Sequence, residues 1–168
     1  MSGMASSSPT APPADTALSE AFLAHGQAVL AAQPFSLLLG TRLQALSAGH
    51  CELQLPITAQ LLQQHGFVHG GVVSYLADNA LTYAGGSALQ VPVVTSELKI
   101  NYLRPAVGDL LIARAHAVHH SRSQAVCRCD VLVVSGGIEK LCAVAQGTIA
   151  VLPPRDDARA SVATAATG

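Results

Sequence analysis

The sequence is poor in charged and aromatic residues. Of its 168 residues, 11% are charged, 4% are aromatic and none is Trp, whereas 50% are hydrophobic. An average soluble chain carries about 25% charged residues, so we expect part of this apolar surface to be buried between copies of the chain. Lys plus Arg number 9 and Asp plus Glu number 10, for a net charge of −1. Without a broad basic field, the sequence predicts no nucleic acid partner.

Long apolar runs and targeting signals are also missing. The apolar segments are interrupted every few residues by Gly, Gln, His or a charge, and none approaches the roughly 18 residues of a membrane helix. The first residues, MSGMASSSPTAPPADTA, contain neither the basic nor the apolar part of a secretory signal. We therefore predict a cytoplasmic protein that does not bind membranes.

Cysteine is scarce, and the common catalytic motifs are absent. The four cysteines are Cys51, Cys127, Cys129 and Cys142, and the two nearest are separated by one residue. This spacing matches neither a zinc nor a redox CxxC motif, so we expect four buried, reduced thiols. The sequence also lacks GxSxG, HExxH, Walker and GxGxxG motifs, which argues against the standard cofactor enzymes and predicts that no cofactor is used.

Composition divides the chain into two tails and one domain. Residues 1–15 and 153–168 are rich in Ser, Ala, Pro and Thr and have few large apolar groups, which predicts disordered tails. Residues 16–152 have the size and composition of a single domain.

The domain has the pattern of an α+β fold. Apolar residues recur at intervals of three and four over 71–89, which predicts one long helix. A looser helical pattern covers 16–32, and alternating apolar residues predict a first strand over 42–57. Further strands are expected at 93–103, 110–120, 124–134 and 138–152. We predict an antiparallel sheet of about five or six strands wrapped around the long helix.

Polar and glycine residues are concentrated at Gln63–Gly71, directly before the long helix. Gly70 and Gly71 at the start of a helix leave backbone N–H groups unpaired, and the helix dipole adds partial positive charge there. A carbonyl oxygen that gains negative charge is stabilised at such a point. The same glycines equally suit a tight turn or close packing, so both interpretations stay open.

Asp78 lies in the middle of the predicted helix, among residues that should be buried by the sheet. A carboxylate in such a place needs polar partners. Ser74 and Thr82, one turn away on either side, would make it a structural residue. Alternatively it is a nucleophile or general base, held where restricted access of water helps it to act.

The spacing of His69 and Asp78 indicates a site shared by two chains. Nine residues of helix correspond to a half-integral number of turns and a rise of about 13.5 Å, so these side chains face apart within one helix. A two-fold dimer would bring the start of the helix in one subunit to Asp78 of the other and create two equivalent sites.

His65 and His69 are four residues apart, a spacing that would put both imidazoles on one face of a helix and so suggests a metal site. Gly66 lies between them and no third ligand is evident, which argues against bound metal. We therefore expect no metal centre.

Four stretches occur together: Gln63-x-x-Gly66-x-x-His69-Gly70-Gly71, Leu76-Ala77-Asp78, Thr95–Pro105 and Gly147-Thr148. In this combination the chain resembles the acyl-CoA thioesterases of the hotdog fold, in the group typified by the phenylacetic-acid-degradation thioesterases. The likeness spans about residues 35–152. It implies a long helix wrapped by an antiparallel sheet, a homodimer with joined sheets and often a homotetramer. It also implies hydrolysis of an acyl-CoA to a free acid and CoA, without metal or organic cofactor.

The resemblance also implies roles for individual residues. Asp78 corresponds to the catalytic nucleophile or general base, and the Gly70 N–H to the group that polarises the thioester carbonyl from the opposite subunit, with His69 supporting that loop. Thr95 falls where the family often has a Ser or Thr that positions the water or the carboxylate. Gln63 replaces an Asn whose amide orients the water. The residues expected to contact substrate are Gly71, Phe67, Tyr75, Thr82 and, at the CoA phosphates, Arg122.

Two other functions stay open at this point. A hydratase or dehydratase of the same fold needs an acid–base pair across a C–C bond, and the order of His and Asp here suits a thioesterase better. A non-catalytic acyl-CoA binding protein has no need of a carboxylate beside the scissile carbonyl. The sequence does not distinguish an aliphatic from an aryl acyl group.

Overall fold

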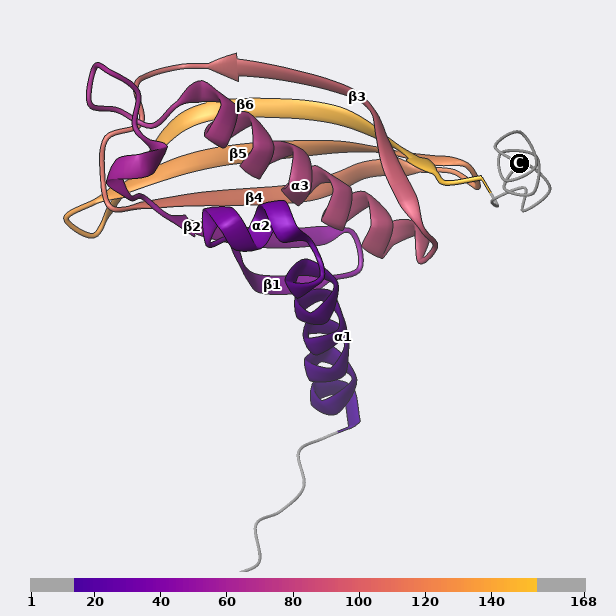
Figure 1. Ribbon diagram of the computed structural model, residues 1–168. Helices are drawn as coiled ribbons and strands as arrows, with labels where there is room; N and C mark the ends of the chain where they lie inside the picture. Colours follow the sequence, from indigo (N-terminus) through magenta and orange to yellow (C-terminus); the bar gives the residue numbers. More distant parts are fainter. Residues whose placement is uncertain (1–13, 154–168) are drawn as a thin grey trace, which may run out of the picture.

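The computed structural model describes residues 14–153 of the chain (Figure 1). Its helices are α1 (Ala14–Ala31), α2 (Pro34–Leu39), the 3-10 turn η1 (Ala59–Leu61) and α3 (Gly70–Leu89). Its strands are β1 (Arg42–Ser47), β2 (His50–Pro56), β3 (Val93–Tyr102), β4 (Leu110–His120), β5 (Gln124–Ser135) and β6 (Ile138–Val151). Most of the two predicted tails, residues 1–15 and 153–168, lies outside the described residues. The last two residues of the first tail, Ala14 and Asp15, belong to α1.

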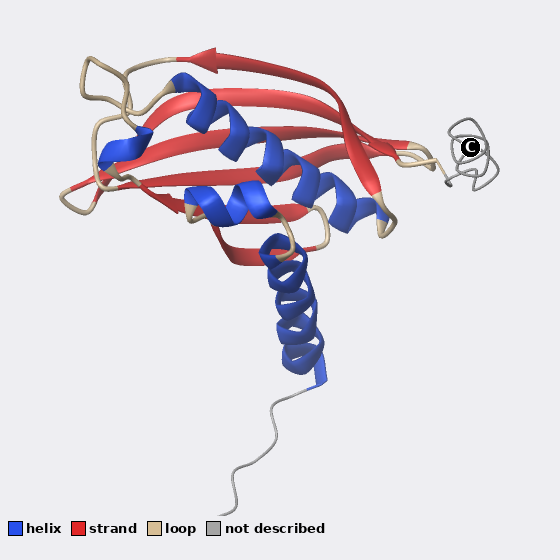
Figure 2. Cartoon of the chain, in the orientation of Figure 1, coloured by secondary structure: helices blue, strands red, loops and turns tan. Residues whose placement is uncertain are grey.

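The six strands form one antiparallel sheet in the order β1-β2-β4-β5-β6-β3. The sheet curves around α3, which runs along its inner face, while α2 and α1 lie toward the β1 side (Figures 1 and 2). This arrangement confirms the predicted α+β hotdog fold, with one long helix wrapped by a six-stranded antiparallel sheet.

The core lies between α3 and the inner face of the sheet. The buried apolar side chains of α3 recur at intervals of three and four: Val73, Leu76, Ala77, Ala80, Leu81 and Ala84. Opposite them, alternate residues of β5 are buried. Gly85 allows the helix to approach β6 closely, because a Cβ at this position would lie 2.7 Å from the Cβ of Ile149. Close packing of this kind fixes how α3 sits on the sheet.

All four cysteines are buried and free, as predicted. Cys127 and Cys129 alternate with polar neighbours along β5 and point into the core. They therefore act as small apolar residues.

The segment 42–57 is two strands, and the prediction of one strand was wrong. β1 and β2 pair in a hairpin in which Ser47 lies opposite His50. Gly49 in the connecting turn has φ +74°, a conformation that glycine adopts without a Cβ clash. The prediction considered the alternation from Cys51 onward and overlooked this glycine.

The helical segment before β1 is also divided. α1 ends at Ala31 and Pro34 begins the short helix α2, since proline is well suited to the first turn of a helix. Among residues 14–153 no helix is both long and apolar enough to cross a membrane.

β3 is an edge strand of the sheet. It pairs with β6 along one side, from Val93 to Tyr102. Its other side leaves backbone N–H and C=O groups available for pairing with another strand.

Candidate active site

The loop before α3 is a tight turn closed by its own backbone. The Gly66 N–H donates to the Gln63 carbonyl, and the Gln63 N–H donates to the Phe67 carbonyl, both at 2.9 Å. Gly66 has φ +79°, which favours glycine. His65 stacks on Phe67 with ring centroids 6.1 Å apart. The segment is not helical, so the spacing of its two histidines does not place them on one helical face. No cluster of three or more potential metal ligands occurs within residues 14–153.

The first residues of α3 form a backbone donor site. His69 is the N-cap, and its Nδ1 accepts a hydrogen bond of 2.9 Å from the Gly71 N–H. Tyr102 donates its hydroxyl to the Gly70 carbonyl at 3.0 Å. Among the described residues the Gly70 N–H has no acceptor. This free donor therefore lies at the positive end of a 20-residue helix.

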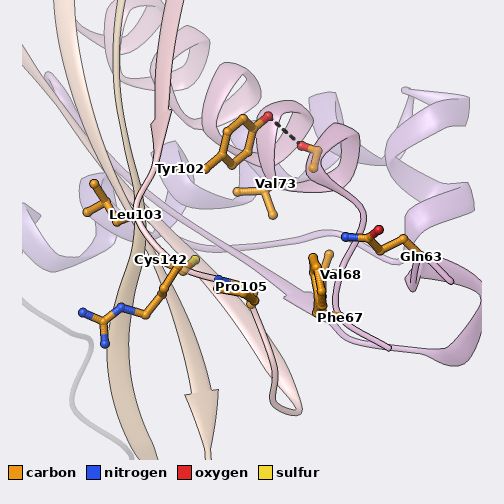
Figure 3. A pocket seen from close by; sticks show the side chains of 11 residues that line it. Gln63, Phe67, Val68, Val73, Tyr102, Leu103, Pro105 and Cys142 are labelled. Atoms are coloured by element: carbon orange, nitrogen blue, oxygen red, sulfur yellow. Dashed lines mark hydrogen bonds between the residues drawn. The ribbon is translucent and has the colours of Figure 1, made fainter. Parts of the chain in front are cut away.

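A pocket of about 450 Å³ opens beside this helix start (Figure 3). Its lining combines the turn, the first turn of α3, the end of β3, the loop that follows β3 and one residue of β6: Gln63, Phe67, Val68, Gly70, Val73, Tyr102, Leu103, Arg104, Pro105, Ala106 and Cys142. Figure 3 shows Gln63, Phe67 and Val68 on one side and Leu103 and Cys142 on the other. The structure thus brings together Gln63, Phe67 and Gly70 of the predicted site residues.

Several lining residues were not predicted as site residues. Tyr102, Leu103 and Arg104 belong to the Thr95–Pro105 stretch that carried the family resemblance, so that motif was the signal available for them. Cys142 had no signal in the sequence. Burial raises the pKa of Cys142 to about 11, so its thiol stays protonated near neutral pH and is a poor nucleophile.

Asp78 belongs to a second group of polar residues. It is half-buried on α3, and its Oδ1 accepts a hydrogen bond of 2.8 Å from the Thr95 hydroxyl on β3. The Thr82 hydroxyl lies 2.9 Å from both Thr95 Oγ1 and the Asp78 backbone carbonyl. Among residues 14–153 the other carboxylate oxygen, Oδ2, has no hydrogen-bond partner. The carboxylate is therefore held at one oxygen and open at the other.

The structure places the remaining predicted residues apart from both groups. Tyr75 faces α2, where its hydroxyl donates to Ser36 Oγ at 2.7 Å and its ring makes an edge contact with Phe35. Asn79, next to Asp78, donates to the Tyr75 hydroxyl at 3.2 Å. These bonds connect the middle of α3 to α2 rather than to the pocket at its start.

Arg122 is exposed in the turn between β4 and β5. The neighbouring Ser123 carbonyl accepts from the Val151 N–H at 2.9 Å, and the Leu152 N–H donates to the Pro92 carbonyl at 2.8 Å. Arg122 therefore lies at the end of the sheet where β3 begins.

Gly70 and Asp78 are separated along a single uninterrupted helix. Asp78 stands eight positions after Gly70 in α3, a rise of about 12 Å, and it is not among the residues that line the pocket at the helix start. One chain therefore carries a backbone donor site and a carboxylate at two separate places.

Comparison with known proteins places this arrangement in a family. The family model of the thioesterase superfamily matches residues 65–139. A solved structure of a thioesterase family protein from Silicibacter pomeroyi is 35% identical, with a TM-score of 0.71, over 75% of this chain and 95% of that one. The acyl-coenzyme A thioesterase PaaI of Escherichia coli is 35% identical over 89 residues, 52% of this chain and 63% of PaaI. The 1,4-dihydroxy-2-naphthoyl-CoA hydrolase of Listeria monocytogenes is 28% identical over 119 residues, 70% of this chain and 94% of the hydrolase.

The chain belongs to the thioesterase superfamily. Within it, the chain is a hotdog thioesterase of the PaaI-like group, and hence an enzyme of the thioester hydrolase class.

Proposed function

We propose that this thioesterase hydrolyses an acyl-CoA to a free acid and CoA, with Asp78 as the reacting carboxylate. The observation that carries the proposal is the hydrogen bond from Thr95 to Asp78 Oδ1, which orients the carboxylate in a half-buried part of α3 and leaves Oδ2 open. The names of two relatives, an acyl-CoA thioesterase and a naphthoyl-CoA hydrolase, support a CoA thioester as substrate.

The complete site, in this proposal, is formed by two copies of the chain. The Gly70 N–H and Asp78 are about 12 Å apart along one α3, too far to act on one carbonyl group. Antiparallel pairing of two β3 edges would lay the two α3 helices side by side in opposite directions. The start of one helix then lies beside the middle of the other, and each dimer has two equivalent sites.

The reaction follows from these two parts. The Gly70 N–H of one copy binds the thioester oxygen and stabilises its developing negative charge. Asp78 of the other copy either attacks the carbonyl carbon or removes a proton from the water that attacks it. If Asp78 attacks, the C–S bond breaks, CoA leaves as the thiolate, and the anhydride formed between the acyl group and Asp78 is hydrolysed by water to the acid and the free carboxylate. If water attacks, the same bond breaks and the acid is released directly. In both routes the thiolate takes up a proton that comes from the water. Gln63 lines the same pocket as Gly70, and in this proposal its amide orients the water.

We assign the CoA phosphates to two arginines. Arg104 lines the pocket beside Gly70, whereas Arg122 lies at the opposite end of the sheet, where β3 begins. Antiparallel pairing of β3 would bring Arg122 of one copy toward Arg104 of the other. Guanidinium groups bind phosphate in a bidentate manner, so a pair of them suits the nucleotide part of CoA.

The test is thiol release from a panel of short aliphatic, long aliphatic and aryl acyl-CoAs, followed with a disulfide reagent. We expect thiol release by the wild type and its loss in the Asp78→Asn variant. Tight binding of acyl-CoA without thiol release would instead establish a binding protein. Loss of the conjugated absorbance of an enoyl-CoA without thiol release would establish a hydratase.

A further inference from the structure

A second hollow lies between α1 and the C-terminal half of α3. It has a volume of about 770 Å³, and its apolar lining includes Phe22 and Val29 of α1, Tyr83 of α3, and Val91 and Val93 at the start of β3. We call it the α1–α3 groove. No Asp, Glu, Lys or Arg is among the residues that line it. The lining also contains His25 and the uncharged polar residues Gln33, Asn79, Thr82, Ser87 and Gln90. The groove therefore suits an apolar chain that carries no charged group.

The α1 wall of the groove is held firmly against the domain. The Tyr83 hydroxyl donates to the Gly26 carbonyl at 3.0 Å, and the Gln27 side-chain amide donates to the Leu43 carbonyl at 3.1 Å. A Cβ at Gly26 would lie 2.6 Å from Leu46 Cδ2 and 2.7 Å from Leu43 Cδ2, so any other residue here would require these two leucine side chains to shift. The groove is thus a built feature of the fold, shaped before any ligand binds.

The groove begins at the hydroxyl groups that hold Asp78. Thr82 lines the groove, and its hydroxyl lies 2.9 Å from the Thr95 hydroxyl that donates to the Asp78 carboxylate. A thioester carbonyl at Asp78 would therefore have its acyl group at the mouth of the groove.

The length of the groove indicates the shape of that acyl group. Asn79 and Gln90 both line it, and Gln90, the C-cap of α3, stands eleven positions after Asn79, a rise of about 16 Å along the helix. This is much longer than a single aromatic ring and matches an extended chain. We infer that the α1–α3 groove binds the acyl group and that the preferred substrate is the CoA thioester of a medium-length aliphatic acid. This inference rests on the proposed function and extends it by naming the substrate class.

The inference is tested with substitutions that fill the end of the groove farthest from Asp78. Val91 is 44% exposed, so Val91→Trp can project into the groove without disturbing the core. We expect the ratio of kcat/KM for decanoyl-CoA to kcat/KM for butyryl-CoA to fall at least about tenfold, because one lost methylene contact already changes specificity by this order. Val29→Trp, which enters from α1, should lower the ratio as well. Ala24→Trp, at an exposed α1 position outside the lining, is the control and should leave the ratio unchanged.

A binding measurement separates failure of the groove from failure of the proposed function. In the Asp78→Asn background, calorimetry should show weaker binding of decanoyl-CoA after Val91→Trp, with a smaller change for butyryl-CoA. Such weaker binding would support the groove as the acyl-binding site even if the wild type released no thiol. The absence of thiol release would overturn only the proposed hydrolysis. An unchanged chain-length ratio and unchanged decanoyl-CoA affinity in both Trp variants would overturn the inference.

Discussion

The start and the middle of α3 offer two different kinds of chemistry. At the start, the useful group is a backbone N–H at Gly70, shaped by a glycine turn and placed at the positive end of the helix. In the middle, it is a side-chain carboxylate at Asp78, half-buried and oriented by a hydroxyl from the neighbouring β3. The first can stabilise an oxyanion and the second can attack or accept a proton. One chain thus carries two chemically different groups at two separate places, and under the proposed function each is one half of a site that two copies complete.

The largest effect is expected at the carboxylate. Asp78→Asn keeps the shape of the side chain and its contact with Thr95 but removes the negative charge, so kcat should fall by about 10² to 10⁴. Steady-state thiol release measures this, and circular dichroism with gel filtration checks that fold and assembly are unchanged. Turnover at the wild-type rate would remove Asp78 from the mechanism.

The next largest effect is expected at the helix start. Gly70→Pro removes the N–H and adds the proline ring, at a position where proline is tolerated. His69 already has an extended conformation of the kind that precedes a proline, with φ −60° and ψ 134°. We expect kcat to fall by about 10² to 10³, the usual loss for one oxyanion donor.

Gly70→Ala is the matched control because it keeps the N–H. The added Cβ would meet Tyr102 at 3.5 Å, an ordinary contact. If the Ala and Pro variants lost activity equally, Gly70 would be required because it has no side chain, and its N–H would not be the important group.

A smaller effect is expected at the residue that orients the carboxylate. Thr95→Val removes the hydroxyl that donates to Asp78 at 2.8 Å, and the loss of a hydrogen bond to a charged group should lower kcat by about 10- to 100-fold. KM should change little, since Thr95 acts through Asp78. Thr95→Ser should restore most of the rate; failure of this rescue would indicate that the methyl group, and not the hydroxyl, matters.

The smallest expected effect is the reaction of the cysteine thiols with a disulfide reagent, which should not occur in the folded protein. Burial raises the pKa of Cys127 and Cys142 to about 11 and that of Cys129 to about 12, so near pH 8 the thiolate fraction is about one in a thousand or less. A disulfide reagent should find no reactive thiol in the folded enzyme and four after unfolding. Rapid labelling of the folded enzyme would contradict this and would obscure the thiol-release assay.

The sequence predicted most of the fold because its elements have clear periods. The α3 pattern of Val73, Leu76 and Ala80 has the period of a helix, and the strands after it were placed within one residue of their ends. The hairpin at Gly49 was missed, since a single glycine in a polar stretch gives little contrast between a turn and a continuing strand. Residue patterns also gave no sign of how closely Gly26 lets α1 approach the sheet.

Only part of the candidate site could be predicted from the sequence, because local patterns group residues that are close along the chain. Residues close in sequence, such as Gln63, Phe67 and Gly70, could be grouped by a motif, and the structure places them in one pocket. Tyr75 was expected at the substrate, and no local pattern indicated that its hydroxyl donates to Ser36 on α2. Its partner is 39 residues away, and contacts at such a distance depend on tertiary packing that no local pattern reveals. The roles of Asp78, Thr95 and Arg122 stay proposals.

The most direct test of the central claim mixes two inactive variants. Asp78→Asn and Gly70→Pro chains, combined by co-expression or by unfolding and refolding together, should form mixed dimers with one intact site each. If each site takes Asp78 from one copy and Gly70 from the other, statistical mixing should restore about one quarter of the wild-type activity. Activity no higher than the sum of the two parent variants, with mixed dimers demonstrated, would contradict a site shared between two copies.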